Sequence, residues 1–405
     1  MKPDPRSAGV AALLTGLVAL GPLSTDLYLP SLPSLTGVFH TDVARVQLTL
    51  SVFLLGFAVS QLIYGPLSDR FGRVPMLIGG LTIYLLASLA CVFSISIEAL
   101  IIARFFQALG GCCGPVLGRA IVRDVYGGEQ AARVLAYISS ATALAPALGP
   151  VLGGYLHLWF GWKSSFYTLA TIGALLLGLV LFALRETNAH RNPHATDPGH
   201  LLKNYYAVLT HKSFLGYALC VAFAYSGIFA FISGSSFVLI DVLHVKPEHF
   251  GLCFATAVAG YMTGTVSVAR LTLRLGIDRM IAAGSLLAAI AGSVMALFAW
   301  AGVVTLTAVL VPTFFCFISA GILMPNAMAG AIHPFPKMAG AASALMGFTQ
   351  MSFAASVGYL VGHLHNGTPL PMALAMAGVG WSAFACYCLL VHRAGVTSMA
   401  KTYRG

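Results

Sequence analysis

Apolar residues in this chain are gathered into long runs that are separated by short polar connections. Twelve runs are present, near residues 9–32, 46–66, 75–95, 98–119, 133–156, 164–184, 214–239, 250–271, 280–301, 304–326, 340–362 and 370–392. A helix of about 20 apolar residues crosses roughly 30 Å of hydrocarbon and satisfies its own backbone hydrogen bonds there. The pattern therefore predicts an all-α membrane protein with twelve transmembrane helices.

The composition argues against a soluble domain of this size. Hydrophobic residues make up 58% of the 405 residues, and charged residues make up only 8%. Ordinary soluble domains carry about 25% charged residues, which cover the surface that faces water. A chain with so few charges lacks the polar surface that a soluble fold needs, so the composition agrees with the twelve predicted spans.

Lysine and arginine are distributed unevenly among the connections. Eighteen of the 22 lie in the termini and the even-numbered connections, and only three lie in the odd-numbered ones. The eighteen are Lys2, Arg6, Arg70, Arg73, Arg119, Arg123, Arg133, Arg185, Arg191, Lys203, Lys212, Arg270, Arg274, Arg279, Lys337, Arg393, Lys401 and Arg404. Because basic loops stay on the cytoplasmic side, we expect both termini in the cytoplasm. The scatter of these residues among short loops argues against nucleic-acid binding.

The eight cysteines form no disulfide or metal-binding pattern. All lie within the apolar runs, and no C-x-x-C spacing occurs. Since thiols in such runs pack as small apolar groups, the sequence predicts free thiols, no metal site and no cofactor. It also lacks converging His, Asp or Ser groups at membrane depth, which argues against an enzyme.

The longest polar stretch divides the chain near its middle. It runs from about residue 185 to 213 and includes RETNAHRNPHATDPGH, which has no apolar periodicity. Such Pro- and Asn-rich segments are typical of loops. We therefore expect an N-terminal six-helix bundle over 1–186, a cytoplasmic linker over 187–212 and a C-terminal six-helix bundle over 213–405.

The two halves resemble each other weakly after their second spans. At a shift of 204 residues, Arg70 and Gly72 overlay Arg274 and Gly276. Parallel six-span repeats with a site between them are typical of one large class of secondary transporters. The sequence thus predicts two pseudo-symmetric bundles.

Two charged residues lie well inside the apolar runs. Asp26 is the only carboxylate and Arg104 the only cation in such a position. A charge at the bilayer centre costs about 2.5–3.5 kcal/mol or more, so such residues usually face the protein interior and carry function. Counting residues places both about 9–10 Å from the outer ends of their runs, at 1.5 Å per residue. We expect Asp26 to carry or gate a proton and Arg104 to tune it; a static ion pair or a helix cap is the alternative.

Further polar and aromatic residues are candidates for a substrate cavity. Gln107 lies one turn from Arg104, where it bonds either a ligand or another helix. On other spans the candidates are Tyr225, Phe229, Asn326 and Gln350, which together with Asp26, Arg104 and Gln107 complete the predicted cavity. Aromatic side chains in membrane helices also serve packing and lipid contact, which is the alternative for the two rings.

The loop GPLSDRFGR, residues 65–73, resembles the signature of the major facilitator superfamily between spans two and three. Glycines allow a tight turn there, and Asp69 is suited to cap a helix or pair with an arginine. The resemblance implies a cytoplasmic gate motif that locks the outward-facing state. Its residues are Gly65, Asp69, Arg70, Gly72 and Arg73.

The segment LAPALGPVLGG, residues 144–154, is similar to the antiporter motif of the same family, which marks exporters. Its small residues at helical spacing permit close helix contact, and its prolines are expected to bend the helix. The motif residues are Pro146, Gly149, Pro150, Gly153 and Gly154. The segment from Arg104 to Gly111 is similar to the span-four motif, in which the arginine is implicated in proton coupling.

The segment DLYLPSLP, residues 26–33, resembles the bicyclomycin/chloramphenicol-resistance (Bcr/CflA) subfamily of drug:proton antiporters. The resemblance implies a monomeric, proton-coupled exporter of small amphipathic drugs in a bacterial inner membrane, working by alternating access. Two alternatives stay open. One is an exporter of a physiological metabolite such as an amino-acid derivative, and the other is a membrane receptor that transports nothing.

Overall fold

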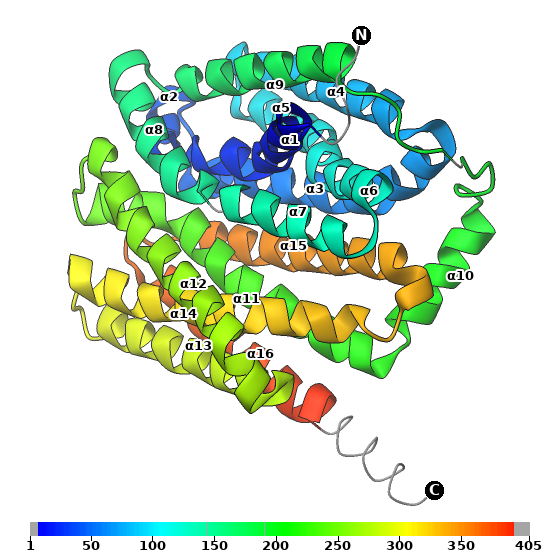
Figure 1. Ribbon diagram of the computed structural model, residues 1–405. Helices are drawn as coiled ribbons and strands as arrows, with labels where there is room; N and C mark the ends of the chain where they lie inside the picture. Colours follow the sequence, from blue (N-terminus) through cyan, green and yellow to red (C-terminus); the bar gives the residue numbers. More distant parts are fainter. Residues whose placement is uncertain (1–6, 143, 190, 393–405) are drawn as a thin grey trace, which may run out of the picture. The chain divides into compact units, whose positions relative to one another are not determined.

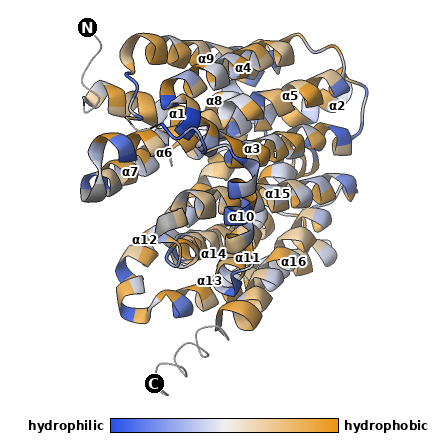
Figure 2. Cartoon of the chain, turned by 90° about the vertical axis from the view of Figure 1, so that its right-hand side faces the viewer, coloured by the Kyte–Doolittle hydropathy of each residue, from blue (hydrophilic) through white to orange (hydrophobic). Residues whose placement is uncertain are grey.

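The computed structural model describes residues 7–142, 144–189 and 191–392, and every regular element in them is helical. Within these residues, twelve helices are long and apolar enough to cross a membrane, which confirms the predicted number. They are Ala8–Val38, Val43–Phe71, Arg73–Val92, Ile97–Tyr126, Arg133–Phe160, Lys163–Ala183, Lys212–Val242, Pro247–Leu275, Ile277–Trp300, Leu306–Ile332, Ala339–His363 and Leu370–Val391. Hydrophobic residues dominate these helices (Figure 2). The predicted all-α membrane class is confirmed.

The chain forms two compact units. One comprises Met1–Leu201 with Lys246–Gly251, and the other comprises Leu202–Val245 with Leu252–Gly405. In the first unit α4 (Arg73–Val92) packs on α5 (Ile97–Gly111) and α9 (Lys163–Ala183). In the second unit α13, α14, α16, α11 and α15 form the packed core (Figure 1). These five helices span Ile277–Trp300, Leu306–Ile332, Leu370–Cys386, Lys212–Ser236 and Ala339–His363.

The weak repeat in the sequence corresponds to the same backbone turn in both halves. Helix α3 (Val43–Phe71) meets α4 at Gly72, with φ 103° and ψ 157°. Helix α12 (Pro247–Leu275) meets α13 at Gly276, with φ 81° and ψ 160°. Positive φ values of this kind favour glycine, which has no Cβ. The two glycines are 204 positions apart, so the repeat predicted from the sequence recurs in the turn geometry.

Span one is not a single helix. Helix α1 (Ala8–Asp26) ends at the aspartate, a 3-10 turn follows over Leu29–Ser31, and α2 (Leu32–Val38) completes the span. Prolines that lack an N–H donor, Pro30 and Pro33, account for the break. The span was predicted to end near residue 32 but continues to 38. Asp26 therefore lies farther from the end of the span than the predicted depth.

Spans four and five are also interrupted. Span four divides into α5 and α6 (Cys113–Tyr126), and span five divides into α7 (Gly128–Thr142) and α8 (Ala145–Phe160). Pro146 lies in the first turn of α8, where a missing N–H costs nothing. The interruption of span five falls directly before Pro146, which begins the second helix, so the bend predicted at this proline stays a prediction that the break agrees with. Pro150 does lie inside α8.

Some of the sequence predictions concern residues outside the described structure, and others concern the cysteines and metal binding. Lys2, Arg6, Arg393, Lys401 and Arg404, which contribute to the charge pattern, lie outside the described residues. All eight cysteines have free thiols, as predicted. In the described parts of the chain, no group of three or more His, Cys, Asp or Glu residues is placed to hold a metal.

Candidate functional site

Arg104 lies on α5 and is fully buried inside the first unit, with 0% of its surface exposed. Its Nη1 donates to the backbone carbonyl of Ser24 on α1 at 2.9 Å and to Oε1 of Gln107 at 2.5 Å. Ser24 precedes Asp26 by two residues, so the guanidinium is within one helical turn of the aspartate along span one. This contact brings Arg104 to the level of Asp26, although span one extends past the end from which the depth of Asp26 was counted.

Three aromatic rings surround the guanidinium. Its carbon lies 4.2 Å from the ring centre of Phe53, 5.2 Å from that of Tyr28 and 5.8 Å from that of Phe166. A cation over a ring gains about 2 kcal/mol or more when water is excluded. The Nε and Nη2 atoms of Arg104 have no hydrogen-bond partner. The buried charge is thus balanced by rings and neutral oxygens, and two of its nitrogen atoms remain available as donors.

The side chain of Gln107 is committed to helix contacts. Its Nε2 donates to Oγ of Ser88 on α4 at 2.8 Å, and the Ser88 hydroxyl donates to the carbonyl of Tyr84 at 2.7 Å. The Tyr84 hydroxyl in turn lies 2.7 Å from Oγ of Ser24. A closed polar network therefore joins α1, α4 and α5 around Arg104. Of the two alternatives for Gln107, the structure has the bond to another helix.

Asp26 lies at the break in span one and is 3% exposed. Its Oδ1 accepts a hydrogen bond from Oγ1 of Thr25 at 3.1 Å. Among the ion pairs of the described residues, none joins Asp26 to Arg104. The aspartate is therefore buried without a cationic partner, and the static ion pair considered from the sequence is not present.

The antiporter segment on α8 packs directly against this break. A Cβ added at Gly149 would lie 2.8 Å from Cβ of Asp26, and one at Gly153 would lie 2.2 Å from the carbonyl oxygen of Leu27. That carbonyl also accepts a hydrogen bond from Oγ of Ser165 on α9 at 3.0 Å. The small residues of the motif therefore pack on the backbone of Asp26 and of Leu27, the residue that follows it. Pro150 and Gly154 are buried in the same helix.

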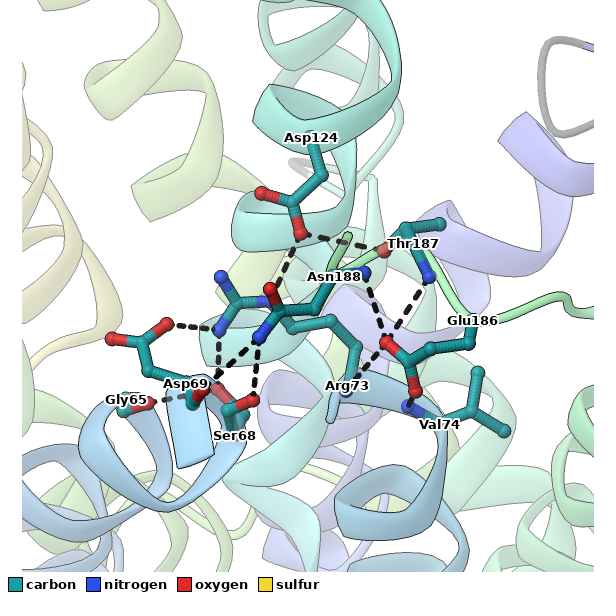
Figure 3. Close-up of polar contacts among 9 residues, drawn as sticks. All are labelled: Gly65, Ser68, Asp69, Arg73, Val74, Asp124, Glu186, Thr187 and Asn188. Atoms are coloured by element: carbon teal, nitrogen blue, oxygen red, sulfur yellow. Dashed lines mark hydrogen bonds and ion pairs between the residues drawn. The ribbon is translucent and has the colours of Figure 1, made fainter. Parts of the chain in front are cut away.

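A second polar network surrounds the turn between α3 and α4 (Figure 3). Arg73 pairs with two carboxylates, through Nη1 with Oδ1 of Asp69 at 2.6 Å and through Nε with Oδ2 of Asp124 at 2.9 Å. Its Nη1 also donates to Oγ of Ser68 at 2.6 Å. Of the two roles considered for Asp69, the structure has pairing with an arginine. Asp124 lies on α6, so Arg73 ties three helices together.

Glu186 caps the first turn of α4, although it lies 113 positions after Arg73 in the sequence. Its Oε1 accepts from the backbone N–H of Arg73 at 2.9 Å, and its Oε2 accepts from that of Val74 at 3.1 Å (Figure 3). A carboxylate at a helix N-terminus is stabilised by these free donors. A Cβ at Gly72 would lie 2.6 Å from Oε2 of Glu186, so the cap requires glycine there.

The polar linker continues this contact as a strap, defined here as residues 186–189 and 191–196. Nδ2 of Asn188 donates to the carbonyls of Ser68 and Asp69, each at 3.2 Å, and the Asn192 N–H donates to the Asp69 carbonyl at 3.0 Å. The Arg70 guanidinium donates to the hydroxyl of Thr196. The strap thus satisfies carbonyls near the end of α3 through Asn188 and Asn192, and the first N–H groups of α4 through Glu186. Gly65, the remaining residue of the predicted gate motif, accepts from Oγ of Ser68 through its carbonyl.

The acid sensitivity of the strap follows from the Glu186 cap. Burial acts to raise the pKa of Glu186, but hydrogen bonds from the N–H groups of Asn188, Arg73, Val74 and Thr187 leave it below its ordinary value of 4.5. A lowered folded-state pKa gives stability that is complete above the unfolded pKa and is lost as pH falls through the folded one. Because Glu186 is largely exposed, we expect Glu186→Gln to cost no more than about 1 kcal/mol at pH 7.

This difference between parent and Glu186→Gln should shrink as pH falls below about 4.5. Thermal-unfolding midpoints of the detergent-solubilised protein between about pH 3 and 8 measure it, since the loss falls below the unfolded-state pKa. The matched control is Glu98→Gln, which removes an exposed pair with Arg45. A constant difference at all pH values, or an equal effect of the control, would contradict the capping role.

The cavity candidates of the second unit lie in different surroundings. Asn326 is 3% exposed; its Nδ2 donates to the Ile322 carbonyl at 2.8 Å, and its Oδ1 accepts from the hydroxyl of Thr272 at 3.2 Å. Phe229 is 1% exposed. Tyr225 and Gln350 are half-buried. A small apolar cavity between α11, α13, α14 and α16 includes none of these four in its lining.

Twelve spans and a turn that recurs in both halves define the class of protein as a polytopic membrane protein, in which Asp26 and Arg104 are buried charges without an ionic partner among the described residues. The family model of the Major Facilitator Superfamily matches residues 14–359. The chain therefore belongs to the Major Facilitator Superfamily, and the predicted resemblance is confirmed.

Individual relatives agree with this family. An uncharacterized MFS-type transporter, YdgK of Bacillus subtilis, is 33% identical and covers 93% of this chain and 94% of its own. A bicyclomycin resistance protein homolog of Haemophilus influenzae is 28% identical over 96% of this chain and 98% of its own. A solved POT family transporter in complex with a thioalcohol-conjugated peptide has a TM-score of 0.77 at 13% identity, covering 95% of this chain and 96% of that one, which shows the fold alone. These relatives are transporters rather than enzymes.

Proposed function

We propose that the chain is a proton-coupled antiporter that exports small amphipathic drugs across a bacterial inner membrane by alternating access. Membership of the superfamily supports transport of a small molecule, and the name of the Haemophilus relative supports an antibiotic-like substrate. The proposal includes the monomeric state and the cytoplasmic position of both termini that the charge pattern predicts.

The observation that carries the proposal is the position of Asp26. It is the one acidic residue among the buried side chains of the described structure, and it lies where span one breaks. Intramembrane carboxyl groups serve as proton relays in pumps and carriers. With no cationic partner, Asp26 is free to gain or lose a proton as its surroundings alternate between wet and dry.

Arg104 has a complementary role in this proposal. Its unpaired Nε and Nη2 atoms are donors that a water molecule or an acceptor group of the substrate would satisfy. The same guanidinium bonds span one at the Ser24 carbonyl, close to Asp26. A substrate that competes for Arg104 would therefore alter the packing around the proton-carrying group.

Drug-driven proton movement in everted membrane vesicles tests the proposal directly. We expect bicyclomycin, a phenicol, a sulfonamide or a lipophilic cation to release protons from vesicles with the parent protein, and Asp26→Asn to abolish this release. The matched control is Asp42→Asn, because Asp42 caps α3 through the Arg45 N–H and asparagine caps equally well. Full proton coupling in Asp26→Asn would exclude Asp26 as the carrier.

The substrate class is tested by the same panel. Proton movement with none of the drugs would contradict drug export and favour a physiological metabolite such as an amino-acid derivative. Ligand-induced thermal stabilisation without any flux would instead favour a membrane receptor.

A further inference from the structure

A short amphipathic helix stands between the sixth and seventh spans. Helix α10 (Pro198–Leu209) follows the strap and precedes α11, the start of span seven (Figure 1). Only Thr210 and His211 separate its last residue from Lys212, the first residue of that span. The three steps from Leu209 to Lys212 reach at most about 10 Å, so the C-terminal end of α10 lies close to the start of span seven and to the membrane boundary.

The side chains of α10 fall into distinct sectors around the helix. One sector faces protein, because Val208 is fully buried and Tyr205 is half-buried. A second sector lies about 100° further round, at 3.6 residues per turn. It carries Leu202, Tyr206 and Leu209, which are 68%, 72% and 42% exposed. This sector therefore exposes an apolar surface next to the face of α10 that packs on protein.

A third sector is exposed and carries the basic residue of the helix. Lys203 lies about 100° beyond Leu202 on the helix, and His200 and Ala207 lie further round on the same side. All three side chains are exposed. The order of protein-facing, apolar and basic sectors around one helix is that of a helix lying at the rim of a membrane protein, in the plane of the interface.

We propose that α10 lies in the adjacent leaflet, with Leu202, Tyr206 and Leu209 inserted at the acyl boundary and with Lys203 and Lys212 binding anionic phospholipid headgroups. Tyrosine suits this depth because its ring is apolar and its hydroxyl stays among the headgroups. Each basic residue close to an anionic membrane surface contributes about 1 kcal/mol, which corresponds to roughly a fivefold change in affinity.

A soluble partner protein is a poorer occupant for this surface. Three exposed apolar side chains on a twelve-residue helix offer far less than the roughly 800 Å² per partner of a standard interface. The short connection to span seven also places the helix where lipid is already present. The membrane is therefore the occupant that the geometry supports.

The proposed lipid contact is separate from the transport function, because it fixes the position of the linker between the two six-helix halves. The strap fixes the start of the linker to the α3–α4 turn, and α10 fixes its end to the lipid. The linker would then be anchored at both ends, and its stability would depend on the lipid composition of the leaflet.

Hydrogen exchange of the full-length protein in nanodiscs tests this proposal. We expect the amides of residues 200–209 to exchange about fivefold more slowly in phosphatidylcholine with 30% phosphatidylglycerol than in phosphatidylcholine alone. Equal exchange in the two lipids would overturn the headgroup assignment, and equally slow exchange in detergent would show that protein covers the face. This comparison needs no variant and no transport measurement, so its failure is distinct from failure of the proposed function.

Two variants locate the contact on the helix. Leu202→Glu combined with Tyr206→Glu should abolish the lipid-dependent protection, because charge is placed on the apolar sector. Ala207→Gln adds a polar, uncharged side chain to the water-facing sector of the same helix and should retain the protection; a carboxylate is avoided there because residue 207 lies one turn from Lys203. An equal loss in both variants would overturn the orientation that the sectors define.

Discussion

A Gly153→Ala variant is expected to lose most of its stability and its transport activity. The added Cβ would lie 2.2 Å from the carbonyl oxygen of Leu27, which is backbone and has no flexible end that can move away. Inserting a methyl group into a packed interior typically costs about 1–3 kcal/mol, and a rigid backbone contact falls at or above the upper end. The thermal-unfolding midpoint and the yield of monodisperse protein in detergent measure this effect.

The chain offers a matched control for this variant in a neighbouring span. Gly178 lies within α9, and a Cβ added there would meet nothing within 4 Å. Gly178→Ala should leave the midpoint unchanged or raise it slightly, since alanine is favoured over glycine in helices. Wild-type stability of Gly153→Ala would mean that α8 does not pack on the break of span one as closely as the structure indicates.

This close contact explains why the antiporter segment and Asp26 belong together. The aspartate is at a helix end, and its neighbours Leu27 and Tyr28 form a turn that links α1 to the 3-10 segment. A backbone that leaves the helix inside a membrane must be covered by protein. The glycines of α8 allow this cover at the shortest distance, so the motif both protects the break and positions the buried carboxyl.

The number and nature of the spans followed from the sequence because hydropathy depends on each segment alone. The end of span one did not, since the polar residues Ser34 and Thr36 and two prolines interrupt the apolar run while the helix continues to Val38. The hydroxyls of Ser34 and Thr36 donate to backbone carbonyls three residues back, which lets these residues remain within the span. Their polarity therefore concealed the true end.

The charged residues of the site were evident from sequence, but their partners were not. Asp26 and Arg104 stood out because each is alone at membrane depth. The Ser24 carbonyl and the rings of Phe53 and Phe166 contact Arg104 only because α1, α3 and α9 pack around α5. A single sequence carries no signal for such packing.

Glu186 was missed for a different reason. The segment that begins with it has no apolar period and was interpreted as a plain linker. Its carboxylate caps a helix that starts 113 positions earlier, and a cap at this separation has no local signature, unlike the usual Ser or Asp three residues ahead. One feature of the sequence does indicate a distant cap. Gly72 precedes α4 and has no side chain to cap this helix, so another residue has to supply the acceptor.

An Arg104→Met variant is expected to fold as well as the parent protein and to lose proton-coupled transport by about 100-fold, equivalent to roughly 2.7 kcal/mol. Methionine fills the space between the three rings and removes a buried charge that has no carboxylate partner. Gln107 keeps its bond to Ser88, so the network between α4 and α5 survives. Thermal-unfolding midpoints and proton movement in everted vesicles measure the two effects separately.

An Arg104→Lys variant distinguishes charge from geometry at the same position. Lysine keeps the positive charge but lacks the planar fork that contacts both Ser24 and Gln107 and faces the rings. If the donors of the guanidinium matter, both variants lose transport, whereas Arg45→Met, at an exposed surface pair, does not. A transport rate in Arg104→Met within threefold of the parent would exclude a coupling role. A buried charge without a carboxylate partner should cost stability, so we expect Arg104→Met to unfold no more easily than the parent protein. A loss of more than about 2 kcal/mol of unfolding free energy in this variant would instead show that Arg104 holds the spans together.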